Sequence, residues 1–140
     1  MPEESTTPNV IELTRRTLEA GNRRDVDAIL SFFAADALWE TTLDGPIEGE
    51  EAIRGAFEDW LGSYEAYEIQ LEEIAHVGGG VVLALTRHRG RLAGGGDLHQ
   101  VSPWVYVWED GVITRFLTTW DDRGIDEARA AAERLAEQRG

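Results

Sequence analysis

The feature that most constrains the fold is a predicted β-hairpin spanning residues 97–122. Two runs rich in β-branched and aromatic residues, Leu98–Trp108 and Val112–Trp120, flank the tripeptide Glu109-Asp110-Gly111. An Asp-Gly pair between two such runs is typical of a hairpin turn, because glycine accepts the positive φ that these turns require. We therefore predict a long antiparallel pair of strands around which the rest of the chain is organised.

The first arm of this hairpin has two different faces, because successive strand residues point to opposite sides of a sheet. One face carries rings and polar groups: Gln100, Ser102, Trp104, Tyr106 and Trp108. The other carries His99, Val101, Pro103, Val105 and Val107. Rings that end in O–H or N–H suit the wall of a ligand pocket. The same pattern is also typical of a filled hydrophobic core.

Composition narrows the class of protein. The 140 residues suffice for one domain, and the formal net charge is −14. That charge argues against binding to nucleic acid or an anionic membrane, since both need clustered Lys and Arg. The first nine residues lack a signal-peptide pattern, and no apolar run is long enough to cross a membrane. We expect a soluble cytoplasmic protein.

Neither a metal nor another cofactor is expected. The chain has no cysteine, which excludes disulfides and cysteine-based zinc sites. The three histidines, His76, His88 and His99, fall on different predicted strands and lack the close spacing typical of metal ligands.

Three helices are predicted ahead of the hairpin. The first ends at about Ala20, Asp25 is placed to cap a short second helix whose apolar face extends to Phe33, and the third begins near Gly49. A brief strand, Ala37–Thr42, and a turn at residues 43–46 lie between the last two helices. Residues 1–8 are polar, contain two prolines and are expected to be a disordered lead-in.

After the third helix the apolar period changes to two. A strand begins at about Ala66, and its phase slips near Glu72-Glu73, which predicts a β-bulge. A further strand, Val81–Arg91, lies between two glycine triplets, 78–80 and 94–96. Neither triplet precedes a helix, so we interpret both as hairpin connections rather than nucleotide-binding loops.

The order of elements predicts an α+β fold, with helices segregated from a curved sheet. We assign residues 9–122 to one domain. Residues 123–140, rich in Ala, Glu and Arg, are expected to form a C-terminal helix or tail, either packed on the domain or used as an oligomer contact.

Three segments, 24–40, 45–57 and 110–121, occur in an order and spacing that resemble the SnoaL-like branch of the nuclear transport factor 2-like superfamily. This branch includes polyketide cyclase-like and ketosteroid isomerase-like proteins. The resemblance implies a cone-shaped barrel, in which a strongly bent antiparallel sheet wraps around three N-terminal helices. It also implies a ligand-sized cavity and a homodimer. Fold alone does not define the activity.

The catalytic groups that the resemblance implies are missing from their usual positions. The ketosteroid isomerase base would follow Glu40, where Thr41 stands, and the tyrosine donor would fall near Thr17. Trp104 occupies the strand position of the second donor, and also that of the His of many SnoaL-like members. An Asp-Arg-Asp epoxide hydrolase arrangement is incomplete, since Arg87 or Arg89 with Asp121 would supply only part of it.

Two residues remain as catalytic candidates. His88 qualifies if Thr86 and His88 face inward, but its position between Arg87 and Arg89 favours a solvent-facing side chain. Tyr106 either donates a hydrogen bond to a substrate carbonyl or simply packs in the core.

Our leading hypothesis is a cavity that binds a small, apolar, ring-containing molecule, with isomerase or cyclase chemistry by proton transfer on a carbonyl compound as the reaction if the protein is an enzyme. The predicted ligand-binding residues are Trp39, Thr41, Phe57, Trp60, Tyr64, Gln100, Trp104, Tyr106, Thr118 and Trp120. The alternative is a non-catalytic binding or scaffold domain that fills its own core and dimerises through the sheet, with Val105 and Val107 buried between subunits.

Overall fold

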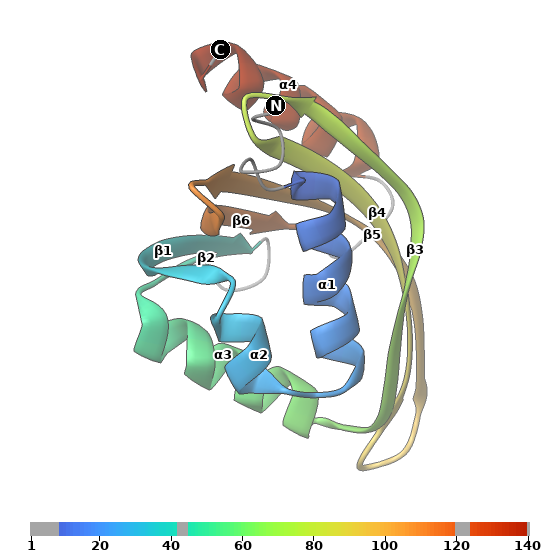
Figure 1. Ribbon diagram of the computed structural model, residues 1–140. Coiled ribbons are helices and arrows are strands. Elements are labelled where there is room, and N and C mark those ends of the chain that lie inside the picture. Colours follow the sequence, from blue (N-terminus) through green and yellow to red (C-terminus); the bar gives the residue numbers. More distant parts are fainter. Residues whose placement is uncertain (1–8, 42–44, 120–123, 140) are drawn as a thin grey trace.

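The computed structural model describes residues 9–41, 45–119 and 124–139. Its elements, in chain order, are α1 (Val10–Asn22), α2 (Val26–Leu30), β1 (Phe33–Thr41), β2 (Gly45–Glu48), α3 (Glu50–Gly62), β3 (Tyr64–Gly78), β4 (Val81–Leu92), β5 (Asp97–Glu109), β6 (Val112–Thr118) and α4 (Ile125–Arg139). Figure 1 shows one bent sheet with α1, α2 and α3 on its concave side and α4 on the opposite face.

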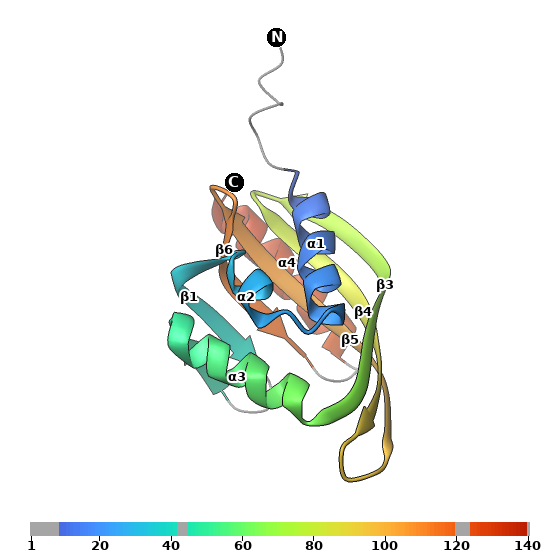
Figure 2. The same ribbon diagram turned by 60° about the horizontal axis from the view of Figure 1, so that its bottom comes forward.

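The six strands are ordered β2-β1-β6-β5-β4-β3. Every neighbouring pair is antiparallel except β1 and β6, which run parallel. The sheet curls around the helices without closing (Figures 1 and 2). The predicted α+β cone is therefore confirmed, with one parallel pair in an otherwise antiparallel sheet.

The helix starts follow from their capping residues. The Asn9 side chain accepts hydrogen bonds from the backbone N–H groups of Ile11 and Glu12 at the start of α1. The Asp25 side chain accepts from the Ala28 N–H and begins α2, as predicted. Gly49, with φ +92°, precedes α3.

The hairpin turn and the bulge are confirmed. Asp110 and Gly111 both have positive φ, +52° and +84°, as a two-residue turn between twisted strands requires. The register of β3 against β4 shifts between Leu71 and Glu73, where the sequence predicts a bulge.

Two sequence expectations about β1 and β2 are wrong. The first strand begins at Phe33 rather than Ala37, because the Ile113 N–H donates to the Phe32 carbonyl and fixes this segment beside β6. Part of the predicted turn at 43–46 is strand: Gly45–Glu48 pairs with β1 as β2. Residues 42–44 lie outside the described part of the chain.

The sheet separates two hydrophobic clusters. The inner cluster joins α1–α3 to the concave face and includes Trp104, Tyr106 and Trp108 of β5. The outer cluster contains Val105 and Val107, which α4 covers with Ala128 and Ala132. The two faces of β5 are thus as predicted, but the valine face is buried by the chain's own C-terminal helix. None of the described helices is long and apolar enough to span a bilayer.

Candidate functional site

A cavity of about 500 Å³, here called the α3 pocket, lies between α3 and parts of β1, β2, β3 and β5. Its lining residues are Trp39, Thr41, Ile47, Ala56, Asp59, Trp60, Ser63, Tyr64, Leu98 and Gln100. Three aromatic rings and three aliphatic side chains supply the apolar surface. Polar groups come from Thr41, Asp59, Ser63, Gln100 and the Tyr64 hydroxyl, and apolar walls with placed polar groups are typical of a small-molecule site.

Trp39 is held in place from two sides. Its ring stacks on Phe57 with a centroid distance of 4.6 Å and an interplanar angle of 24°. Its Nε1 donates a hydrogen bond of 2.9 Å to Oγ1 of Thr118. This wall of the α3 pocket is therefore rigid, because both neighbours are themselves buried.

A second, inner cavity lies deeper in the cone and is almost filled. Its volume is about 20 Å³, roughly the space of one water molecule. Its lining residues are Thr17, Leu18, Gly21, Ile29, Phe33, Phe57, Trp60, Leu61, Ile69, Trp104, Tyr106 and Phe116. Of the described residues that line either cavity, only Trp60 lines both.

Tyr106, one of the two catalytic candidates, lies on the wall of this inner cavity. It is 2 % exposed, and burial raises the pKa of its phenol, an effect that a hydrogen bond with Thr17 opposes. The Thr17 hydroxyl beside the phenol also donates to the Thr14 carbonyl over 2.7 Å. In this structure Tyr106 is therefore a buried packing residue rather than a donor to a ligand.

The expectation that His88 faces solvent is wrong. Its side chain is fully buried on the concave face, with ring contacts to Trp60, Tyr67 and Trp104. The alternation of β4 points Thr86 and His88 inward and leaves Arg87 on the outer surface. There Arg87 contacts Glu72 at 3.0 Å and His99 at 2.9 Å.

His88 lies in a chain of hydrogen bonds that joins Tyr67, His88, Thr86 and the Ser102 carbonyl, and every donor in it points toward Ser102. The hydroxyl of Thr86 donates to the Ser102 carbonyl at 2.9 Å, so its oxygen accepts from Nε2 of His88 at 2.8 Å. Nδ1 of His88 then lacks a proton and accepts from the Tyr67 hydroxyl at 2.5 Å. The indole of Trp60 lies against Tyr67 and opposes the rise of the Tyr67 pKa. The chain runs from Tyr67 into the sheet.

Burial keeps both ring systems of this chain neutral. It lowers the pKa of His88 to about 4, and it raises the pKa of Tyr67 well above its ordinary value. The imidazole is therefore unprotonated near pH 7 and has a lone pair for a proton, but its low pKa makes it a weak base. In this state Trp60 lies between the pair and the α3 pocket.

The predicted ligand-binding residues fall into groups. Trp39, Thr41, Trp60, Tyr64 and Gln100 line the α3 pocket. Phe57, Trp104 and Tyr106 line the inner cavity, and Thr118 supports Trp39. Trp120 lies outside the described residues, as does Asp121 of the epoxide hydrolase alternative.

Five residues of the α3 pocket were not predicted: Ile47, Ala56, Asp59, Ser63 and Leu98. Ala56 lies one turn before Trp60 on α3, so the helix period places it on the same face, whereas Asp59 directly precedes Trp60 in sequence. Ile47 carries no such signal, since the sequence predicts a turn over part of β2. Glu40 is half-buried and forms an ion pair with Arg115.

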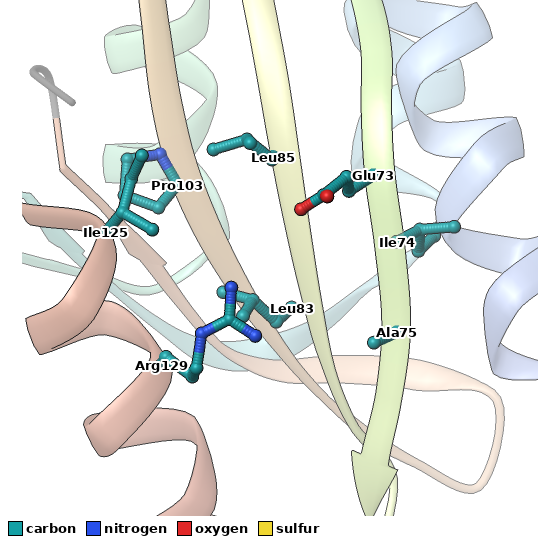
Figure 3. Close-up of a pocket in the computed structure, with 8 residues that line it drawn as sticks. All are labelled: Glu73, Ile74, Ala75, Leu83, Leu85, Pro103, Ile125 and Arg129. Carbon is teal, nitrogen blue, oxygen red and sulfur yellow. The ribbon is translucent and has the colours of Figure 1, made fainter.

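A third hollow, of about 380 Å³, lies on the outer face between β3 and α4. Figure 3 shows the Arg129 guanidinium and the Glu73 carboxylate facing it from opposite sides, over Leu83, Leu85 and Pro103. The sheet separates it from the aromatic residues of the concave face. Within the described part of the chain, no group of three His, Asp or Glu side chains could hold a metal ion.

The sequence of residues 14–116 matches the family model of the SnoaL-like domain. The match covers most of the chain. The protein belongs to the SnoaL-like family. This SnoaL-like domain, within the nuclear transport factor 2-like superfamily, accordingly has the cone fold expected from the resemblance. No curated protein matches the chain.

Solved structures share the fold of this SnoaL-like domain at low sequence identity. An NTF2-like protein of unknown function from Burkholderia pseudomallei is 20% identical, with a TM-score of 0.73 over 87% of this chain and 98% of its own. TerC, crystallised with polyporic acid, is 18% identical, with a TM-score of 0.71 over 85% and 96%. The epoxide hydrolase/cyclase-like enzyme SalBIII, of pyran ring formation in salinomycin, is 19% identical, with a TM-score of 0.73 over 88% and 96%. At these identities the likeness shows the fold alone.

Proposed function

We propose that this protein binds a small, largely apolar, ring-containing molecule in the α3 pocket. The observation that carries the proposal is the pocket itself, about 500 Å³ with Trp39, Trp60 and Tyr64 in its walls. This volume lies within the range of small-molecule sites, and the aromatic walls favour planar ring-containing ligands. TerC, with polyporic acid, is a protein of this fold that was crystallised with a small molecule.

The charge of the site disfavours an anionic ligand. Asp59 is the charged residue among the described lining residues, and it is exposed at the pocket. The whole chain has a formal net charge of −14, which repels anions at long range. Thr41 and Gln100 supply neutral polar groups that would orient a carbonyl or hydroxyl of the ligand.

Titration calorimetry against steroid-like, polyketide-like and terpenoid compounds tests the proposal. Ala56→Phe places a ring in the pocket and should weaken binding at least tenfold, whereas Ala52→Phe, on the exposed side of α3 one turn earlier, should not. Equal affinities in the two variants would contradict the assignment of the pocket. No binding by any compound would favour the alternative, a non-catalytic scaffold with a self-filled core, which the small inner cavity already suits.

A reaction by proton transfer on a carbonyl compound is the second candidate, and the Tyr67–His88 pair favours it. One protein of this fold is named epoxide hydrolase/cyclase-like. The test is hydrogen–deuterium exchange next to the carbonyl of 2-tetralone, followed by NMR. We expect the wild type to accelerate the exchange and His88→Gln to lose the acceleration. Equal rates in both proteins would exclude this role for His88.

We also propose a cytoplasmic homodimer, as the family resemblance implies. Because α4 covers Val105 and Val107, the interface is expected on another surface than this valine face. Sedimentation equilibrium measures the mass: twice 15.6 kDa supports the dimer, and 15.6 kDa contradicts it.

A further inference from the structure

Trp60 separates the α3 pocket from the inner cavity. It lies in the last turn of α3, and it is the described residue that lines both spaces. The rings around it are almost completely buried: Trp39 and Phe57 are 4 % exposed and Trp104 is 3 % exposed. Trp60 is only half-buried, so one side of its ring already borders the pocket.

Trp60 contacts the rings of Trp39, Phe57, Tyr67, His88 and Trp104, and none of these contacts is a parallel stack. It meets Tyr67 edge-on, at a centroid distance of 5.3 Å and an angle of 82°, and Trp104 at 5.9 Å and 65°. Its indole lies close enough to the Tyr67 oxygen to oppose the rise of the Tyr67 pKa. By contrast Trp39 is stacked face to face and hydrogen-bonded to a buried threonine.

We propose that Trp60 is a movable partition, and that a ligand displaces it to place its own O–H or N–H group on the Tyr67 oxygen. This inference rests on the proposed function and defines the ligand class of the same site. The direction of the hydrogen bonds from Tyr67 through His88 to Thr86 determines which polar group the ligand must carry. The Tyr67 proton is committed to Nδ1 of His88, so Tyr67 offers the ligand an acceptor and not a donor.

The matching ligand is a planar apolar ring system with a hydroxyl or N–H at one end. A phenol satisfies both requirements, because its ring replaces the indole ring and its O–H replaces the indole N–H. An ether or a ketone of the same shape does not, since it would leave the buried Tyr67 oxygen without a donor.

The first test compares 2-naphthol with 2-methoxynaphthalene by titration calorimetry. We expect the wild type to bind 2-naphthol about tenfold more tightly, and Tyr67→Phe to bring the two affinities within about twofold. Tyr64→Phe, which removes a hydroxyl from the pocket wall but not from the chain, should leave the ratio unchanged. Trp60→Phe removes the competing indole N–H, so this variant should bind 2-naphthol several-fold more tightly than the wild type.

The second test observes the partition directly. In protein labelled with 5-fluorotryptophan, the ¹⁹F resonance of Trp60 is identified by its absence in Trp60→Phe. Saturation with 2-naphthol should shift this resonance. The resonance of Trp108, whose indole donates to Thr14 elsewhere in the core, should stay unchanged. A bound ligand that leaves the Trp60 resonance unmoved, or a wild-type affinity ratio near one, overturns the inference but not the proposed pocket. Absence of binding by any compound overturns both.

Discussion

The indole Nε1 of Trp39 donates a hydrogen bond of 2.9 Å to Oγ1 of Thr118, across 79 residues of sequence. The bond joins β1 to β6, the parallel pair of the sheet, beneath the wall of the α3 pocket. It couples the rigidity of the pocket to the pairing of two strands from opposite ends of the chain.

Thr118→Val should therefore destabilise the protein by about 1–3 kcal/mol, because it leaves the buried Trp39 N–H without its acceptor. Urea unfolding measures the change. In a double-mutant cycle with Trp39→Phe, the second substitution should cost less once the first is present. Additive effects of the two substitutions would show that the hydrogen bond contributes nothing.

The buried imidazole should make stability depend on pH. The pKa of His88 is about 4 in the folded protein against an ordinary value of 6.5, so between these values the unfolded chain binds more protons. The stabilisation is present above pH 6.5 and is lost as the pH falls toward 4. Between pH 8 and pH 5 the loss should be about 2 kcal/mol.

Carboxylates also titrate in acid and change the free energy of unfolding. The contribution of His88 is therefore measured as the difference between the wild type and His88→Gln. Urea unfolding at pH 8 and pH 5 should show a larger loss in the wild type than in His88→Gln, by about 2 kcal/mol. The same loss in both proteins would mean that His88 is protonated in the folded state.

Gly80 is required where two hairpins meet. Its φ is +82°, and a Cβ there would lie 2.4 Å from the Trp108 carbonyl oxygen. Gly80→Ala should cost more than about 2 kcal/mol, since the backbone of β5 must move. The control is Gly55→Ala within α3, where a Cβ meets nothing within 4 Å and the helix should gain about 0.5–1 kcal/mol. Thermal melts of both variants would distinguish these opposite signs.

Ala132 is completely buried between α4 and the valine face of β5. Ala132→Asp should detach α4, because an unpaired carboxylate is costly in this apolar cluster. We expect dye binding to the uncovered Val105 and Val107, and self-association at higher concentration. A variant that remains monodisperse and binds no dye would show that α4 is dispensable for covering the sheet.

Local pattern was sufficient for most of the elements. The period-two alternation of Leu98–Trp108 identified the aromatic face, and the phase slip at Glu72-Glu73 located the bulge. Asp25 and the Asp-Gly turn identified a helix start and a hairpin. These features depend on neighbours close in sequence, whose geometry the backbone imposes before any tertiary contact forms.

Only the tertiary structure decided the orientation of His88 and the shape of the site. Arg87 and Arg89 made an exposed histidine the natural expectation, but the alternation of β4 within the sheet points His88 into the cone. Similarly, Trp60 becomes a partition only when α3 packs over Tyr67 and Trp104. The sequence by itself determined which residues are apolar, which are ring-bearing and where the strands turn. Which rings fill the core and which line a pocket depended on contacts between distant segments, because burial is a property of the packed chain and not of its local period.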